Sequence, residues 1–257
     1  MIRPAIWLPT LLVLCLAGCA DQSVNVAGTQ LDLYTYRPPG CKPQVVLLVF
    51  HGQSRNAWSY RDATRFLTDR FCGFVVAPEF DAVRFPPREL YEFGRVTKEA
   101  PGHRTIDLVP PLVAWVRNAV DAPSLPFVLL GHSSGGQIVS RVVAFLSTGA
   151  AGIIVANPST WVLPGTTIAA PYGLGGTKAA TDDALRAYLA RPVTVLGDAQ
   201  QLANHKVSTW RARSLGVPCA VGWISSCAIH RFFGLRRRLG AEVGGWRKSL
   251  STLQMKR

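Results

Sequence analysis

Residues 127–136 read FVLLGHSSGG, an apolar run followed by glycine, histidine, two serines and two more glycines. Gly131 and Gly135 each stand two residues from Ser133, so the stretch contains the pattern G-x-S-x-G. Glycines at these places allow a sharp turn between a buried strand and a helix, and such a turn pushes the serine hydroxyl out above a sheet. We therefore predict that Ser133 is a nucleophile. A tight strand-to-helix turn whose serine has no role is the alternative.

Short apolar runs alternate with amphipathic stretches on both sides of this turn. The pattern predicts strands at 31–36, 44–50, 73–77, 127–130, 152–156 and 193–196, and helices at 58–67, 108–120, 136–146 and 181–189. Residues 79–103 contain three prolines and little periodicity, which favours a long surface loop. Strands that alternate with helices indicate the α/β class, with a mostly parallel central sheet covered by helices on both faces.

The composition is that of one globular domain, since the 257 residues are 48% hydrophobic and 17% charged. The net charge of +13 is distributed unevenly: residues 1–198 carry 17 basic and 14 acidic side chains, whereas 199–257 carry 11 basic and 1 acidic. A general affinity for nucleic acid is therefore not indicated, because the excess charge belongs to the tail alone.

The first residues have the features of a secretory signal. Arg3 supplies an early positive charge, and Ala5–Leu16 is an apolar stretch too short to span a bilayer. Residues 16–19, Leu-Ala-Gly-Cys, resemble the bacterial lipobox, which implies a signal peptide over 1–18 and a lipid on Cys19 that anchors the protein to a membrane. An ordinary cleavage site after small residues is the alternative.

The resemblance to lipoproteins also implies where the chain is located. Residues 19–28 are expected to form a polar tether between the lipid and a domain over 29–257. Ala20 follows the cysteine, and by resemblance to the enterobacterial sorting rule this favours the outer membrane. The expected location is the cell envelope, either periplasmic or surface-exposed.

Two cysteines are expected to lie close together. Cys41 comes just before the predicted strand 44–50 and Cys72 just before 73–77, so both would lie at the same ends of two parallel neighbours. An exported protein can oxidise such a pair. A Cys41–Cys72 disulfide is compatible with this placement, and two buried free thiols are the alternative.

The stretch from about residue 31 to residue 198 resembles the α/β-hydrolase superfamily, and within it the secreted bacterial esterases of the polyhydroxybutyrate-depolymerase and feruloyl-esterase type. His51-Gly52 at the end of a strand, the G-x-S-x-G turn, and Gly197-Asp198 after a late strand carry this resemblance. It implies the α/β-hydrolase fold. It also implies an oxyanion hole formed by the backbone N–H groups of Gln53 and Ser134, with His51 shaping the first of these loops.

The resemblance implies an acid and a base after the serine, in the order serine, acid, histidine. Asp198, 65 residues past Ser133, is the expected acid; Asp182 and Asp183 are alternatives, although both fit the first turn of a helix. His230 is the expected base. The glycine that the family has close before this histidine is missing here. The weaker candidates for the base are His205, His51 and His132.

The tail over residues 199–257 is atypical for this family. It holds 11 basic residues, 1 acidic residue and three of the seven tryptophans, with Arg236-Arg237-Arg238 beside Phe232-Phe233. One interpretation is a basic surface that faces solvent or anionic lipid. The other is a segment read out of frame, because the change in composition begins where the resemblance ends.

Two functions remain open. The first is a lipid-anchored serine hydrolase that cleaves a carboxylic ester, from a small molecule or a polymer, through an acyl-enzyme. The second is a catalytically inactive lipoprotein of the same fold that binds a partner in the cell envelope. No cofactor is expected, and no metal, because no group of His, Cys and carboxylate residues has ligand spacing. The sequence does not indicate an oligomeric state.

Overall fold

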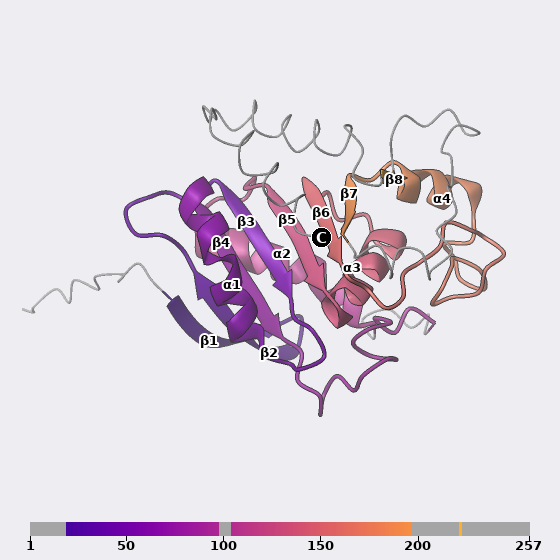
Figure 1. The fold of residues 1–257 in the computed structure, drawn as a ribbon, viewed down its shortest axis with the longest axis horizontal. Helices are drawn as coiled ribbons and strands as arrows, with labels where there is room; N and C mark the ends of the chain where they lie inside the picture. The colour runs from indigo at the N-terminus through magenta and orange to yellow at the C-terminus, as the bar shows by residue number, and fades with distance from the viewer. Residues whose placement is uncertain (1–18, 98–103, 197–220, 223–257) are drawn as a thin grey trace, which may run out of the picture.

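The computed structural model describes residues 19–97, 104–196 and 221–222, and these residues form a single eight-stranded sheet with its covering helices (Figure 1). The strand order is β1-β2-β4-β3-β5-β6-β7-β8. The strands are β1 (Cys19–Val26), β2 (Thr29–Tyr36), β3 (Val45–Phe50), β4 (Gly73–Glu79), β5 (Phe127–His132), β6 (Gly152–Ala156), β7 (Val193–Leu196) and β8 (Val221–Gly222). The helices are α1 (Ala57–Phe71), the 3₁₀ turn η1 (Thr105–Leu108), α2 (Val109–Ala119), α3 (Ser134–Phe145) and α4 (Asp182–Leu189).

The strands from β4 to β8 are parallel neighbours, whereas β1 and β2 join them through antiparallel pairs. The predicted class, a mostly parallel sheet with helices on both faces, is thereby confirmed. In a parallel sheet the carboxyl ends of the strands share one edge, and in this class the ligands bind beyond that edge. The turn after β5 lies there.

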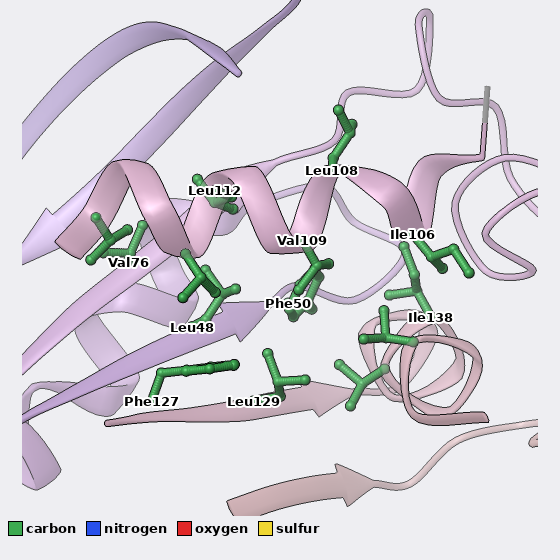
Figure 2. Packing of buried hydrophobic residues seen from close by; sticks show 14 of the residues in the cluster. Leu48, Phe50, Val76, Ile106, Leu108, Val109, Leu112, Phe127, Leu129 and Ile138 are labelled. Carbon is green, nitrogen blue, oxygen red and sulfur yellow. The ribbon is translucent and has the colours of Figure 1, made fainter. Parts of the chain in front are cut away.

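Alternate residues of each strand point to opposite faces, and each face has its own core. Leu48 and Phe50 of β3 pack with Phe127 and Leu129 of β5 against α2 and α3, where Leu112 and Ile138 lie (Figure 2). The strand residues between them, such as Val49 and Val128, pack on the other face with Ala57 and Leu67 of α1. Because both faces of these strands are buried, their sequences are continuous apolar runs.

The prediction of a tether over 19–28 is wrong for the residues that form β1. This strand pairs with β2 from Cys19 opposite Tyr36 to Val26 opposite Thr29, and Val26 is buried in the core. Ala27 and Gly28 connect the two strands and both have positive φ, of 48° and 84°. Positive φ at both positions is the geometry of a type I′ turn, whose twist matches that of a hairpin. The sequence does not suggest a two-residue turn here, because alanine is rare at a position with positive φ.

The predicted surface loop over 79–103 is confirmed only in part. We call residues 80–97 the β4–η1 segment. It contains no regular helix, but several of its side chains are buried, among them Phe80, Tyr91, Glu92 and Val96. Backbone hydrogen bonds hold it together, for example from Phe93 N to Arg88 O at 2.7 Å. Residues 82–89 are exposed except for Phe85, as a surface loop predicts, whereas the part around Tyr91 and Glu92 belongs to the core.

Cys41 and Cys72 lie together as predicted, and the structure has them as free thiols, so the disulfide is absent. The hydrogen bond from the Cys72 side chain, followed by burial, raises the pKa of Cys41 to about 11. Among the helices that the structure describes, none is long and apolar enough to cross a membrane.

Candidate active site

Ser133 lies in a strained turn between β5 and α3. Its φ of 55° and ψ of −119° fall close to the first central position of a type II′ turn, a place that glycine normally takes. The turn is held from both sides, because Ser133 N donates to Ala156 O at 2.9 Å and Ser133 O accepts from Gln137 N at 3.1 Å. Such strain persists only where the surroundings impose it, and it is concentrated at functional sites.

The neighbouring glycines serve close packing rather than unusual φ angles. A Cβ on Gly131 would overlap the Gly135 carbonyl, and one on Gly135 would overlap the Phe50 carbonyl at the end of β3. Neither glycine has a positive φ. The glycines allow the sharp turn by letting the first turn of α3 press against β3 and β5, and the backbone strain falls on Ser133.

The two expected oxyanion donors come from loops that lie against each other. Ser134 is the first residue of α3, and its N–H belongs to the first turn, where the helix offers no acceptor and its dipole favours negative charge. Gln53 follows β3 and is exposed. A Cβ on its neighbour Gly52 would lie 3.7 Å from Ser133 Cβ. The loop after β3 thus passes beside the serine.

His51 is fully buried and both of its ring nitrogens are occupied. Nδ1 lies 2.8 Å from Gly52 O, and Nε2 accepts from Phe80 N at 3.0 Å. This pattern assigns the proton to Nδ1. Burial lowers the pKa of His51 to about 4. A neutral ring with no free nitrogen cannot take a proton from Ser133, so His51 shapes the loop and is eliminated as a candidate for the base.

Tyr60 is a site residue that the sequence did not reveal. Its hydroxyl lies 2.9 Å from His132 Nδ1 and only 2.6 Å from where a Cβ on Gly52 would be. Burial raises the pKa of Tyr60, and a hydrogen bond from the Gly52 backbone opposes this. Tyr60 therefore joins the loop after β3 to the turn after β5. The sequence showed it only as one apolar residue in a helical pattern.

The expected acid and base are not among the residues that the structure describes. Asp198, His230 and the alternative His205 all lie outside them. β7 ends at Leu196, and its carboxyl end lies at the same edge of the sheet as Ser133. Asp182 and Asp183 occupy the exposed first turn of α4, as the alternative interpretation states, and Asp183 forms an ion pair with Arg186 at 3.0 Å.

Two further expectations concern lipid and metal. Cys19 is the first residue of β1, and its lipidation stays a prediction. Within 19–97, 104–196 and 221–222, no group of three or more His, Cys, Asp or Glu residues could hold a metal ion.

Two solved structures that resemble this chain cover most of its length. The chain is similar to LpqC, a poly(3-hydroxybutyrate) depolymerase from Bordetella parapertussis, with 31% identity over 87% of this chain and 79% of that one, and a TM-score of 0.66. It is similar to poly(aspartic acid) hydrolase-1 from Sphingomonas sp. KT-1, with 28% identity over 88% of each chain and a TM-score of 0.66. No curated protein sequence matches it.

The family comparison also covers most of the chain. Residues 45–252 match the model of the alpha/beta hydrolase family. The strand order, the strained serine between β5 and α3, and the similarity to LpqC agree with this match. The chain belongs to the alpha/beta hydrolase family.

Proposed function

We propose that the chain is a serine hydrolase that cleaves carboxylic esters through an acyl-enzyme on Ser133. The observation that carries the proposal is the backbone of Ser133, held at a φ of 55° where β5 meets α3. If this residue only connected a strand to a helix, glycine would serve better, because glycine adopts this φ without strain. Membership of a hydrolase family supports the same conclusion.

In the proposed mechanism, Ser133 Oγ attacks the carbonyl carbon of the ester while His230 takes its proton. Asp198 holds the imidazole in the correct tautomer and stabilises its charged form. The N–H groups of Gln53 and Ser134 stabilise the oxyanion, each contributing about 3 kcal/mol. His230 then protonates the departing alcohol, and a water molecule hydrolyses the acyl-enzyme by the same steps.

The two similar proteins suggest which substrates to test. One is named for a polyester and the other for poly(aspartic acid), an anionic polymer joined by amide bonds. The ester bond of the first polymer and the amide bond of the second are both acyl bonds that a serine nucleophile can cleave. We propose an ester as the substrate class, and poly(3-hydroxybutyrate) and poly(aspartic acid) are the polymers that should be compared in one assay.

The decisive experiment is hydrolysis of p-nitrophenyl acetate and butyrate by the purified protein. Ser133→Ala should abolish turnover and labelling by a fluorophosphonate probe, and Ser59→Ala, in α1, should leave both unchanged. His230→Ala and Asp198→Ala should each reduce kcat by at least about a hundredfold. Turnover that survives Ser133→Ala would overturn the proposal. A wild-type protein that neither turns over nor labels would support the inactive binding lipoprotein instead.

We also propose that Cys19 is lipidated and anchors the protein in the cell envelope. The support is the sequence Leu-Ala-Gly-Cys at 16–19. Cells that express the full chain should incorporate labelled palmitate into it, and Cys19→Ala should remove the label and release the protein from the membrane fraction. Incorporation that is equal in both would refute the proposal.

A further inference from the structure

Two consecutive residues of the β4–η1 segment reach the two loops that carry the expected oxyanion donors. The first is Tyr91, which is fully buried. Its hydroxyl donates to His51 O at 2.7 Å, and its ring stacks on that of His51 with centroids 4.7 Å apart. Tyr91 thus holds the backbone two residues before Gln53.

Glu92 reaches the other loop. Its side chain is buried, Oε1 accepts from Ser134 Oγ at 3.1 Å, and Oε2 accepts from the backbone N–H of Arg88. Ser134 is the residue whose N–H is the second expected donor. The Glu92 carboxylate therefore holds the side chain of Ser134, the first residue of α3.

Two arginines surround this pair with positive charge. The guanidinium carbon of Arg55 lies 4.3 Å from the centre of the Tyr91 ring, and Arg55 Nη1 donates to Phe80 O at 2.5 Å. Burial lowers the pKa of Arg55, and its interactions with Tyr91 and Glu92 oppose this. Arg141 of α3 is fully buried; burial lowers its pKa to about 10, and Glu92 is among the groups that oppose this.

A buried carboxylate is costly unless its surroundings compensate for it. An apolar residue at position 92 would fill the space without that cost, but it could not bond to Ser134. The contact of Glu92 with the first residue of α3, next to a tyrosine that bonds to the other loop, therefore indicates a role in the geometry of the site.

We propose that Tyr91 and Glu92 are positioning residues that set the spacing of the two oxyanion donors, Gln53 N–H and Ser134 N–H. This inference rests on the proposed function. Oxyanion donors act at hydrogen-bond distance from an oxygen whose charge develops only in the transition state, so a small displacement of either loop lowers kcat more than it changes KM.

The test compares Tyr91→Phe and Glu92→Leu with a matched control, Tyr188→Phe. Tyr188 Oη donates to Val162 O at 2.7 Å, so the control also removes one tyrosine-to-carbonyl hydrogen bond of the same length, but from α4. Three quantities are measured for each variant: kcat and KM for p-nitrophenyl butyrate, the affinity for a phenylboronic acid that forms a tetrahedral adduct with the serine, and the midpoint of urea unfolding.

Tyr91→Phe and Glu92→Leu should each lower kcat by about tenfold to a hundredfold with little change in KM, and weaken boronate binding by a similar factor. Tyr188→Phe should lower the unfolding midpoint without these effects. Glu92→Gln keeps an acceptor oxygen for Ser134 Oγ but loses the bond from the Arg88 backbone N–H, so it should restore part of the lost kcat. This rescue separates positioning from simple destabilisation.

The inference is overturned if Tyr91→Phe and Glu92→Leu keep the wild-type kcat and boronate affinity and change only the unfolding midpoint. It is also overturned if Ser134→Ala, which removes the hydroxyl that bonds to Glu92 and keeps the backbone N–H, retains the wild-type kcat and boronate affinity. If the wild-type protein does not hydrolyse esters, the proposed function itself fails. The wild type is therefore assayed first, and the variants test the positioning role only when it is active.

Discussion

Replacing Ser133 by glycine should stabilise the protein while it abolishes activity. The turn holds an L-residue at φ 55° and ψ −119°, a conformation that glycine adopts without strain. Alanine removes the hydroxyl but keeps the Cβ and therefore keeps the strain. The comparison of Ser133→Gly with Ser133→Ala thus isolates the cost of the backbone conformation from the loss of the hydroxyl group.

The magnitude follows from two opposing contributions. A non-glycine residue in such a region costs about 1 to 3 kcal/mol, which glycine recovers. Glycine in turn loses more conformational freedom on folding, which costs about 0.5 to 1 kcal/mol. Ser133→Gly should therefore be more stable than Ser133→Ala by about 1 kcal/mol, corresponding to a rise in Tm of about 2 to 4 °C for a domain of this size.

The assay is equilibrium urea unfolding of wild type, Ser133→Ala and Ser133→Gly. Ala63→Gly on the exposed face of α1 is the control, since the same exchange of alanine for glycine in a helix should cost about 1 kcal/mol. Opposite signs at positions 133 and 63 are the expected result. If Ser133→Gly is no more stable than Ser133→Ala, the turn is not strained, and the main argument for Ser133 as the nucleophile fails.

Neighbouring features lead to three more predictions. Gly135→Ala should prevent folding or destabilise the protein by more than about 3 kcal/mol, because its Cβ would meet the Phe50 carbonyl, whereas Gly152→Ala, with its nearest neighbour at 3.5 Å, should be tolerated; expression level and urea unfolding measure both, and equal effects would contradict the packing argument. The unfolded chain binds a proton at His51 near pH 6.5 and the folded chain only near pH 4, so stability should fall by roughly 3 kcal/mol as the pH drops between these values and stay constant above them. His51→Gln should flatten this dependence in urea titrations, and a His51 imidazole signal that titrates near pH 6.5 in the folded protein would contradict the prediction. Cys41 should react with iodoacetamide at pH 8 at least about tenfold more slowly than an ordinary cysteine, and Cys72→Ala should accelerate the reaction because it removes the main cause of the raised pKa; mass spectrometry follows the rate, and equal rates in both proteins would refute the coupling.

The central strands and the serine turn were predictable because local signals and long-range packing agree there. The run FVLL at 127–130 is buried on both faces, and Thr181 caps α4 by accepting from Ala184 N at 3.2 Å, as its position before two acidic residues suggests. The turn around Ser133 was recognisable for the same reason. The residues that approach Gly131 and Gly135 most closely are near them in sequence or lie at the end of a predicted strand.

The elements that were missed depend on contacts between distant segments. β1 forms because Val26 reaches the core and Asp21 forms an ion pair with Arg61 at 2.7 Å, and neither contact is visible in a polar stretch that follows a signal sequence. The roles of Tyr91 and Glu92 were hidden in the same way, because their partners His51 and Ser134 lie about 40 residues away along the chain. Prolines in the segment suggested a surface loop, while its apolar residues, spaced without a period, gave no sign of burial.

The strand β1 has a consequence for how an anchored chain would face its surroundings. β1 is antiparallel to β2, and β2 is antiparallel to β4, so Cys19 begins at the amino edge of the parallel strands. Ser133 follows β5 at the carboxyl edge, about 20 Å farther along the strand direction for strands of this length. Because β1 begins at residue 19, acyl chains on Cys19 would hold the amino edge of the sheet close to a bilayer, with Ser133 on the edge that faces away from it.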